Sequence, residues 1–201
     1  MTESNRINLA TVNFDQLREI LLHLLATEAY QEGDFTLSSG QKSSYYINGK
    51  PVSLSAKGAF AIGHLFFSCL PSETQAVAGL TLGADPLVSA VTVVSAYENC
   101  PIPGIIVRKT PKGHGTNAYL EGKRLPPQAK VVVLEDVVTT GNSALFAVEQ
   151  LKAAGYQVSQ ILAIVDREQG GKELYQEQGI QFQSLFSISE VQAYAQTLPS
   201  P

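Results

Sequence analysis

Two adjacent carboxylates stand at the end of an apolar run and directly before a turn rich in hydroxyl groups. The stretch reads Val131-Val-Val-Leu-Glu135-Asp136-Val-Val-Thr139-Thr140-Gly141-Asn142-Ser143. Because residues 131–134 show no polar alternation, they predict a strand buried on both faces of a parallel sheet. Strands of this kind end at the edge where open α/β sheets bind their ligands.

The turn that follows the carboxylates favours a phosphate. Backbone amides of a turn and of a helix N-terminus can surround a phosphate, and Gly141 lets the chain approach it closely. The threonine and serine hydroxyls add donors. Glu135 and Asp136 would repel a second phosphate but accept hydrogen bonds from sugar hydroxyls. The pattern therefore predicts a site for a phosphorylated sugar.

Two other interpretations compete with the sugar-phosphate site. A dinucleotide or nucleoside triphosphate site would need a GxGxxG or GxxxxGK[ST] sequence after a strand, and no predicted strand is followed by one. Alternatively, the acid pair only solvates a strand end and Gly141 makes an ordinary turn. The hydroxyl-rich glycine turn directly after the carboxylates favours the sugar phosphate.

Residues 108–124 form a second region that could do chemistry. The region begins Arg108-Lys109-Thr-Pro-Lys112-Gly113-His114-Gly115 and has no apolar periodicity. Loops this long are usually functional or disordered, and the two glycines around His114 predict a mobile segment. In an acidic protein, this cluster favours binding of an anion, and pyrophosphate is the leaving group that the sugar-phosphate site predicts. The alternative is a solvated charged loop.

Size and composition limit the functional classes. The chain has 201 residues and a net charge of −4, which suit one α/β domain without a basic field for nucleic acid or membrane. Residues 1–6 lack a signal-peptide layout, and no apolar run approaches the roughly 18 residues of a membrane span. Cys69 and Cys100 stand outside disulfide and zinc motifs. We therefore expect a cytoplasmic protein.

Strands that alternate with helices predict an α/β fold with a doubly wound, mostly parallel sheet. Asn13 and Gln16 form a predicted capping box, and Asp85-Pro86 predicts a helix start with Asp85 as its N-cap. A short hairpin is expected to turn near Gly40. Helices are expected at about 14–25, 55–70, 85–98, 142–154, 172–178 and from 187, and strands at 76–81, 105–109, 131–135, 158–165 and 182–186.

The chain resembles a known family along most of its length. Residues 131–143 resemble the phosphoribosyl pyrophosphate signature of the type I phosphoribosyltransferases. The Arg-Lys-x-x-Lys-x-His-Gly sequence at 108–115, followed by Leu-Glu-Gly at 120–122, resembles the catalytic loop of the orotate phosphoribosyltransferases. Residues 35–48 and 165–170 are similar to that family's substrate segment and orotate-binding strand end.

The resemblance implies the type I phosphoribosyltransferase fold in one domain, residues 1–201, with a long flexible catalytic loop. Residues 1–55 would form a small N-terminal hood and substrate segment, and residues 56–201 the core. The implied reaction transfers the 5-phosphoribosyl group from phosphoribosyl pyrophosphate to orotate, giving orotidine 5-monophosphate in pyrimidine biosynthesis. We also expect a monofunctional enzyme.

The resemblance also implies the site residues. Catalytic roles would fall to Arg108, Lys109, Lys112, His114 and Asp136. Phosphoribosyl pyrophosphate would contact these four cationic residues together with Glu135, Asp136, Val137, Val138, Thr139, Thr140, Gly141, Asn142 and Ser143. Orotate would contact Thr139, Arg167, Tyr46 and Ile47. Mg²⁺ is the implied cofactor, held mainly by ligand oxygens and water, and the implied assembly is a homodimer with shared active sites.

Arg167 suits the base because a guanidinium can make paired hydrogen bonds to a planar acceptor edge. The alternative for Arg167 is an ion pair with Asp166 or Glu168. Tyr45 and Tyr46 could equally be core aromatics, which is the commoner role for such residues.

The chain departs from the family pattern at two positions. Many members have lysine where Ser38 and Gly83 stand, and Lys42 or Lys50 are candidates to compensate. Two rival functions remain at this point: a phosphoribosyltransferase for another base, and a non-catalytic regulator of the same fold that senses phosphoribosyl pyrophosphate. Such a regulator would bind RNA or DNA and would therefore need a basic face, which the net charge of −4 does not favour.

Overall fold

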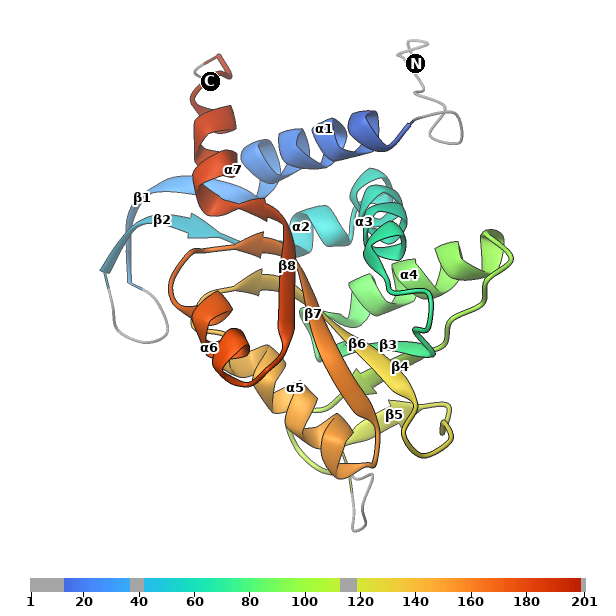
Figure 1. Ribbon diagram of the computed structural model, residues 1–201. Helices are drawn as coiled ribbons and strands as arrows, with labels where there is room; N and C mark the ends of the chain where they lie inside the picture. Colours follow the sequence, from blue (N-terminus) through green and yellow to red (C-terminus); the bar gives the residue numbers. More distant parts are fainter. Residues whose placement is uncertain (1–12, 37–41, 113–118, 200–201) are drawn as a thin grey trace.

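The computed structural model describes residues 13–36, 42–112 and 119–199, and its centre is a six-stranded sheet in the order β5-β4-β3-β6-β7-β8 (Figure 1). The strands are β3 (Ala76–Leu80), β4 (Gly104–Val107), β5 (Leu120–Gly122), β6 (Lys130–Val138), β7 (Gln157–Asp166) and β8 (Gln181–Ser187). All neighbours are parallel except β4 with β5, which are antiparallel. The predicted α/β fold with a mostly parallel sheet is confirmed.

Helices cover both faces of this sheet (Figure 1). The core helices are α3 (Ala56–Cys69), α4 (Asp85–Tyr97), α5 (Asn142–Ala153) and α6 (Gly171–Glu177). Val132 and Leu134 of β6 join the apolar cluster beneath α3 and α4, whereas Val131 and Val133 join the cluster beneath α5 and α6. Because both faces of β6 are buried, the strand shows no polar alternation.

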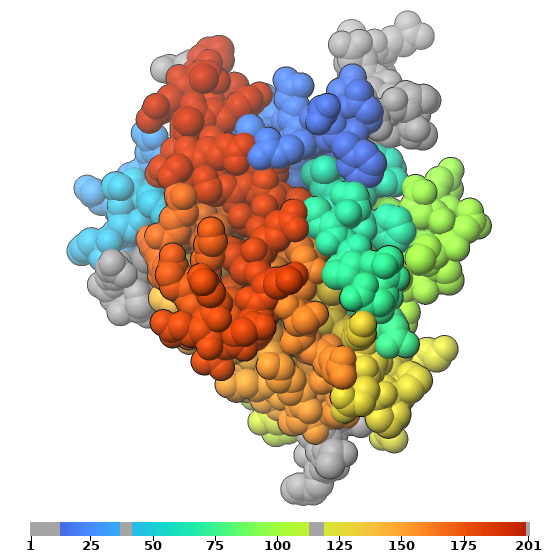
Figure 2. Space-filling view, viewed as in Figure 1, coloured from blue at the N-terminus to red at the C-terminus, as the bar shows by residue number. Residues whose placement is uncertain are grey.

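A smaller layer, the hood, covers one end of the sheet. It contains α1 (Phe14–Leu24), the π-helix η2 (Leu25–Ala29), the hairpin β1 (Tyr30–Thr36) with β2 (Lys42–Ile47), α2 (Lys50–Ser53) and α7 (Ile188–Ala195). Figure 2 shows α7 packed beside α1, although the two helices come from opposite ends of the chain.

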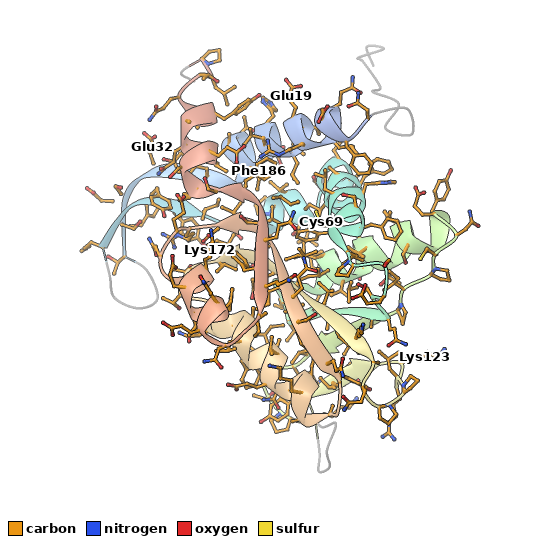
Figure 3. All side chains as sticks on the ribbon, in the orientation of Figure 1. Glu19, Glu32, Cys69, Lys123, Lys172 and Phe186 are labelled. Atoms are coloured by element: carbon orange, nitrogen blue, oxygen red, sulfur yellow. The ribbon has the colours of Figure 1, made fainter. Side chains whose placement is uncertain are left out.

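Arg18 of α1 ties the two ends of the chain together. Its Nη2 donates to the Leu185 carbonyl at 3.2 Å and pairs with Glu190, and its guanidinium lies 4.6 Å from the centre of the Phe186 ring. Figure 3 shows Phe186 on β8 near the base of α7. The hood therefore contains a C-terminal helix as well as the N-terminal segment expected from the sequence.

Most predicted elements appear within a few residues of their expected bounds. The capping box between Asn13 and Gln16 is present, but the N-cap of α4 is Ala84, so the prediction of Asp85 as the cap was wrong. The sequence pattern missed η2, α2 and β5, and the predicted turn at Gly40 lies outside the described residues. No helix in the described ranges is long and apolar enough to span a membrane.

Candidate active site

The carboxyl ends of four parallel strands meet at one edge of the sheet. Val138 of β6 lies beside Asp166 of β7, and the Arg167 amide donates to the Val138 carbonyl at 2.8 Å. Leu80 of β3 and Val107 of β4 likewise end side by side. The acid pair, the hydroxyl-rich turn and the basic residue after β7 therefore share one edge, where open α/β sheets bind ligands.

The two carboxylates of the acid pair have different surroundings. Glu135 is only 6% exposed, its Oε1 accepts the Asp136 amide at 3.2 Å, and its Oε2 has no partner in the described structure. Burial, and then the neighbouring Asp136 charge, raises the pKa of the Glu135 carboxyl well above its usual range. Because buried polar atoms are normally paired, an unpartnered acceptor at a strand end indicates a place for a ligand donor.

Asp136 lies beside Glu135 but is packed against backbone on one side. Its Oδ1 accepts the Val137 amide at 2.9 Å, and its Oδ2 lies 3.7 Å from the Lys50 Nζ. A Cβ added at Gly83 would lie 2.9 Å from Oδ1 and 3.1 Å from Oδ2 of Asp136. The absence of a side chain at Gly83 thus lets the turn after β3 contact the carboxylate directly.

The turn from Thr139 to Ser143 lines a cavity of about 80 Å³ that Glu135 and Tyr175 also border. Gly141 has a φ of 86°, and a Cβ there would come within 2.9 Å of the Tyr175 ring, so only glycine fits without strain. The Tyr175 hydroxyl donates to the Gly141 carbonyl at 3.0 Å. Burial raises the pKa of Tyr175, which keeps this donor protonated.

Arg167 is buried at the end of β7, with only 7% of its surface exposed. Its Nε donates to the Tyr45 hydroxyl at 3.2 Å, and its guanidinium lies 4.7 Å from the centre of the Tyr45 ring. Its Nη2 has no partner within the described ranges. Asp166 instead accepts the Glu168 amide at 2.8 Å, so the alternative of a surface ion pair does not describe this arginine.

The predicted pyrophosphate cations occupy the outer part of the edge. Arg108 Nη1 lies 3.2 Å and Lys112 Nζ 3.5 Å from the same Glu121 Oε1 on β5, while Lys109 is exposed. His114 lies outside the described residues. Exposed ion pairs of this kind contribute about 0–1 kcal/mol, so a polyanion can replace Glu121 at low cost.

Comparisons with known proteins agree with this geometry. No family model matches the chain. The chain is 61% identical over 192 residues to an orotate phosphoribosyltransferase of Synechocystis, covering 96% of this chain and 97% of that one. It is 62% identical over 189 residues to one of Nostoc, covering 94% and 92%. The chain belongs to the orotate phosphoribosyltransferase family.

A solved member of this family has the same fold. It is the orotate phosphoribosyltransferase of Mycobacterium tuberculosis in complex with 5-phospho-alpha-D-ribosyl 1-diphosphate, with a TM-score of 0.73 and 30% identity. The match covers 88% of this chain and 99% of that one. The type I phosphoribosyltransferase fold expected from the sequence is therefore confirmed.

The sequence pattern assigned Tyr46 and Ile47 to orotate and left Tyr45 as a candidate core aromatic, whereas Tyr45 contacts Arg167. Tyr46 is 42% exposed and packs against Phe35 at 5.5 Å between ring centres, and Ile47 lies in the core. Strand alternation was the available signal, since Tyr45 shares the face of the buried Ile47 while Tyr46 points the other way. No sequence signal indicated Tyr175, whose contact with Gly141 joins residues 34 positions apart.

The family's implied Mg²⁺ has suitable donors at this edge. Within the described ranges, no group of three or more histidine, cysteine, aspartate or glutamate side chains could hold a metal. Two carboxylates do lie together, however, and Glu135 Oε2 lacks a partner. Mg²⁺ prefers oxygen ligands and keeps much of its shell for water and substrate phosphates, so this acid pair fits a cation bound largely through substrate.

Proposed function

We propose that the chain transfers the 5-phosphoribosyl group of phosphoribosyl pyrophosphate to orotate, giving orotidine 5-monophosphate and pyrophosphate for de novo UMP synthesis. One observation carries the proposal: a buried, unpartnered Arg167 nitrogen lies at the strand end adjacent to the acid pair and the glycine turn. A site for a planar acceptor thus adjoins a site for a sugar phosphate. The name of the relatives states the same transfer.

The sugar would be bound by the strand end of β6 and the turn after it. The Thr139–Ser143 turn would hold the 5-phosphate with backbone amides and hydroxyls at the start of α5. Glu135 and Asp136 would accept the two ribose hydroxyls. The negative charge of Asp136 then lies near the anomeric carbon, which becomes positive as its bond to pyrophosphate breaks, and this stabilises the transition state.

The base would be bound by Arg167, with Thr139 beside it. A ring nitrogen of orotate would attack the anomeric carbon as the bond to pyrophosphate breaks. The acceptor edge of the pyrimidine would accept hydrogen bonds from the unpartnered Arg167 Nη2. Tyr45 fixes the guanidinium through its hydroxyl and ring, so little side-chain freedom is lost on binding. The backbone of Tyr46 and Ile47 would complete this pocket.

The leaving pyrophosphate would be neutralised by Arg108, Lys109, Lys112 and His114. Arg108 and Lys112 would exchange Glu121 for the pyrophosphate, because its charge is larger than that of one carboxylate. Closure of the loop over the substrate would exclude water and strengthen these interactions. Mg²⁺, when bound, would supply Lewis-acid stabilisation of the pyrophosphate oxygens, with Glu135 and Asp136 as the nearest protein donors.

A homodimer with shared active sites and a cytoplasmic location complete the proposal. Leu82, Val93 and Tyr97 are 72%, 69% and 82% exposed, and Val93 and Tyr97 stand one helical turn apart on α4. Such an apolar surface suits a subunit interface. Cys69 and Cys100 are free thiols, which suits a reducing compartment.

Loss of orotate absorbance on addition of phosphoribosyl pyrophosphate and Mg²⁺ tests the proposed reaction. The purified chain should consume orotate and release pyrophosphate in equal amounts. A phosphoribosyltransferase for another base would leave orotate unchanged but consume that base. A regulator would bind phosphoribosyl pyrophosphate without turnover, so either result would overturn the proposal.

Mixing two impaired variants tests whether active sites are shared. Lys112→Ala subunits retain the acid pair, and Asp136→Ala subunits retain the cationic loop. If the loop of one subunit serves the partner's site, mixed dimers should recover part of the wild-type rate. No recovery after confirmed subunit exchange would argue for self-contained sites.

A further inference from the structure

Lys50 is a cation at the acid pair that the reaction described above has not used. Its Nζ lies 3.7 Å from Asp136 Oδ2, and in the described structure no other lysine or arginine forms an ion pair with that carboxylate. The Lys50 side chain is 48% exposed, whereas that of Asp136 is 13% exposed. The amine therefore stands at the mouth of the site, on the solvent side of the carboxylate that would hold ribose.

The backbone fixes the position from which Lys50 reaches the site. A Cβ added at Gly49 would lie 3.3 Å from the Asp136 Cβ, so the chain before Lys50 is packed against the acid pair. The Lys50 amide donates to Asn48 Oδ1 at 3.2 Å, and the Ser53 amide donates to the Gly49 carbonyl at 2.8 Å. The backbone at Lys50 is thus held in place, while its half-exposed side chain is free to move.

Substrate binding would change the partner of this amine. A ribose hydroxyl bound to Asp136 Oδ2 at about 2.8 Å would lie no farther than about 6.5 Å from the Lys50 Nζ, which is itself 3.7 Å from that oxygen. The pyrophosphate leaves from the carbon next to the one that carries the 2-hydroxyl. A small rotation of a flexible four-carbon side chain would therefore bring the ammonium to a pyrophosphate oxygen.

The 5-phosphate is a poorer partner for Lys50. The cavity formed by the Thr139–Ser143 turn is lined by residues 135 and 137–144 and by Tyr175, and Lys50 is not among its lining residues. That turn has its own amide and hydroxyl donors. Gly83, which contacts the same Asp136 carboxylate from the turn after β3, offers no charge. Among the described residues, Lys50 is thus the cation that pairs with the carboxylate at the junction of ribose and leaving group.

We propose that Lys50 is a substrate-binding residue whose ammonium moves from Asp136 to the pyrophosphate of the bound substrate. The inference rests on the proposed function, because it needs pyrophosphate to leave from this site. Lys50 would thus add a cation of the hood to the cations at residues 108–112.

Titration calorimetry with two probes tests this role. Inorganic pyrophosphate with Mg²⁺ reports the leaving-group site, and ribose 5-phosphate reports the acid pair and the phosphate turn without a pyrophosphate. Lys50→Met should weaken pyrophosphate binding about tenfold, the low end for a lost hydrogen bond to a charged group, and leave ribose 5-phosphate within threefold. Lys50→Arg should recover most of the pyrophosphate affinity.

Lys130→Met is the matched control. Lys130 is likewise about half exposed, and its Nζ lies 3.6 Å from Glu73 Oε1 at the start of β6, the end of that strand away from the acid pair, so its removal should leave both affinities within twofold. Equal pyrophosphate affinity in Lys50→Met and wild type would overturn the inference. So would a loss confined to ribose 5-phosphate, because Lys50 would then act only by positioning Asp136. A wild-type chain that binds neither probe and consumes no orotate would instead refute the proposed function.

Discussion

The candidate site has two halves that are built in different ways. In the inner half, which comprises Glu135, Asp136, the Thr139–Ser143 turn and Arg167, Glu135 and Arg167 are buried, and each has one polar atom without a partner in the described structure. In the outer half, Arg108 is half-buried, Lys109 and Lys112 are exposed, and the side chains of Arg108 and Lys112 share Glu121. The inner half is ready for ribose and base, whereas the outer half must exchange a partner to receive pyrophosphate.

Because of this difference, binding the two ends of the substrate has different free-energy consequences for the protein. Buried groups that await a ligand lower the stability of the free protein, because unpaired polar atoms cost about 1–3 kcal/mol each. Exposed ion pairs cost little free energy to break. Cations held in such pairs can therefore release Glu121 when pyrophosphate binds and pair with it again when pyrophosphate leaves. Variants in the two halves should therefore fail in different kinetic steps.

Asp136→Asn should have the largest effect, because it removes the charge that faces the anomeric carbon. We expect kcat to fall about 100- to 1,000-fold, the range for loss of one preorganised electrostatic group. Steady-state kinetics with saturating orotate and phosphoribosyl pyrophosphate measure this effect. A kcat within twofold of wild type, in a variant that melts normally, would remove Asp136 from the reaction.

Arg167→Met, also in the inner half, should have the second-largest effect, and it should act on orotate binding. We expect the KM for orotate to rise about 10- to 100-fold, since hydrogen bonds to a charged group contribute about 1.5–3 kcal/mol. The KM for phosphoribosyl pyrophosphate should stay within threefold. Tyr45→Phe, which keeps the ring but removes the hydroxyl that accepts from Arg167, should give a smaller rise. An unchanged orotate KM in Arg167→Met would exclude it from the base site.

Lys112→Ala probes the outer half and should act on rate rather than on orotate binding. Its charge partner develops as pyrophosphate departs, so we expect kcat to fall about tenfold, equivalent to about 1.4 kcal/mol of transition-state stabilisation. The orotate KM should stay within twofold. If kcat is unchanged and the orotate KM rises instead, the division of the site into two halves fails.

Glu135→Gln should give the smallest effect, on stability. Because burial raises the pKa of Glu135, the folded protein retains this proton at pH values where the unfolded chain has lost it. Wild-type stability therefore decreases as pH rises above the ordinary glutamate range. At pH 8 the variant should melt about 2–4 °C higher than wild type, and the difference should disappear near pH 4. An equal difference at both values would contradict the burial argument.

The sequence predicted the inner half better than the outer half. A short run of β-branched apolar residues with no alternation favours a strand buried on both faces, so it predicted β6 and hence the position of the acid pair. Gly141 and the hydroxyl side chains around it then predicted where α5 begins. Both signals are local, which is why they can be read from neighbouring residues.

The contacts missed from the sequence depend on long-range packing. Tyr45 meets Arg167 across 122 positions, and Arg108 meets Glu121 through a short strand, β5, that has no apolar period of its own. Lys50 reaches Asp136 because Gly49 lies against that residue, which only the assembled hood determines. The sequence shows which residue types could act at a site, but only the fold shows which of them lie in contact.

Hydrogen exchange with and without phosphoribosyl pyrophosphate and Mg²⁺ tests the division of the site most directly. Peptides that cover residues 131–138 should be protected in the free protein and change little, because both faces of β6 are already buried. Peptides that cover residues 108–112 and 119–122 should gain protection when the ligand is bound. Equal gains in both regions, or a gain confined to β6, would contradict a prepared inner half and an exchanging outer half.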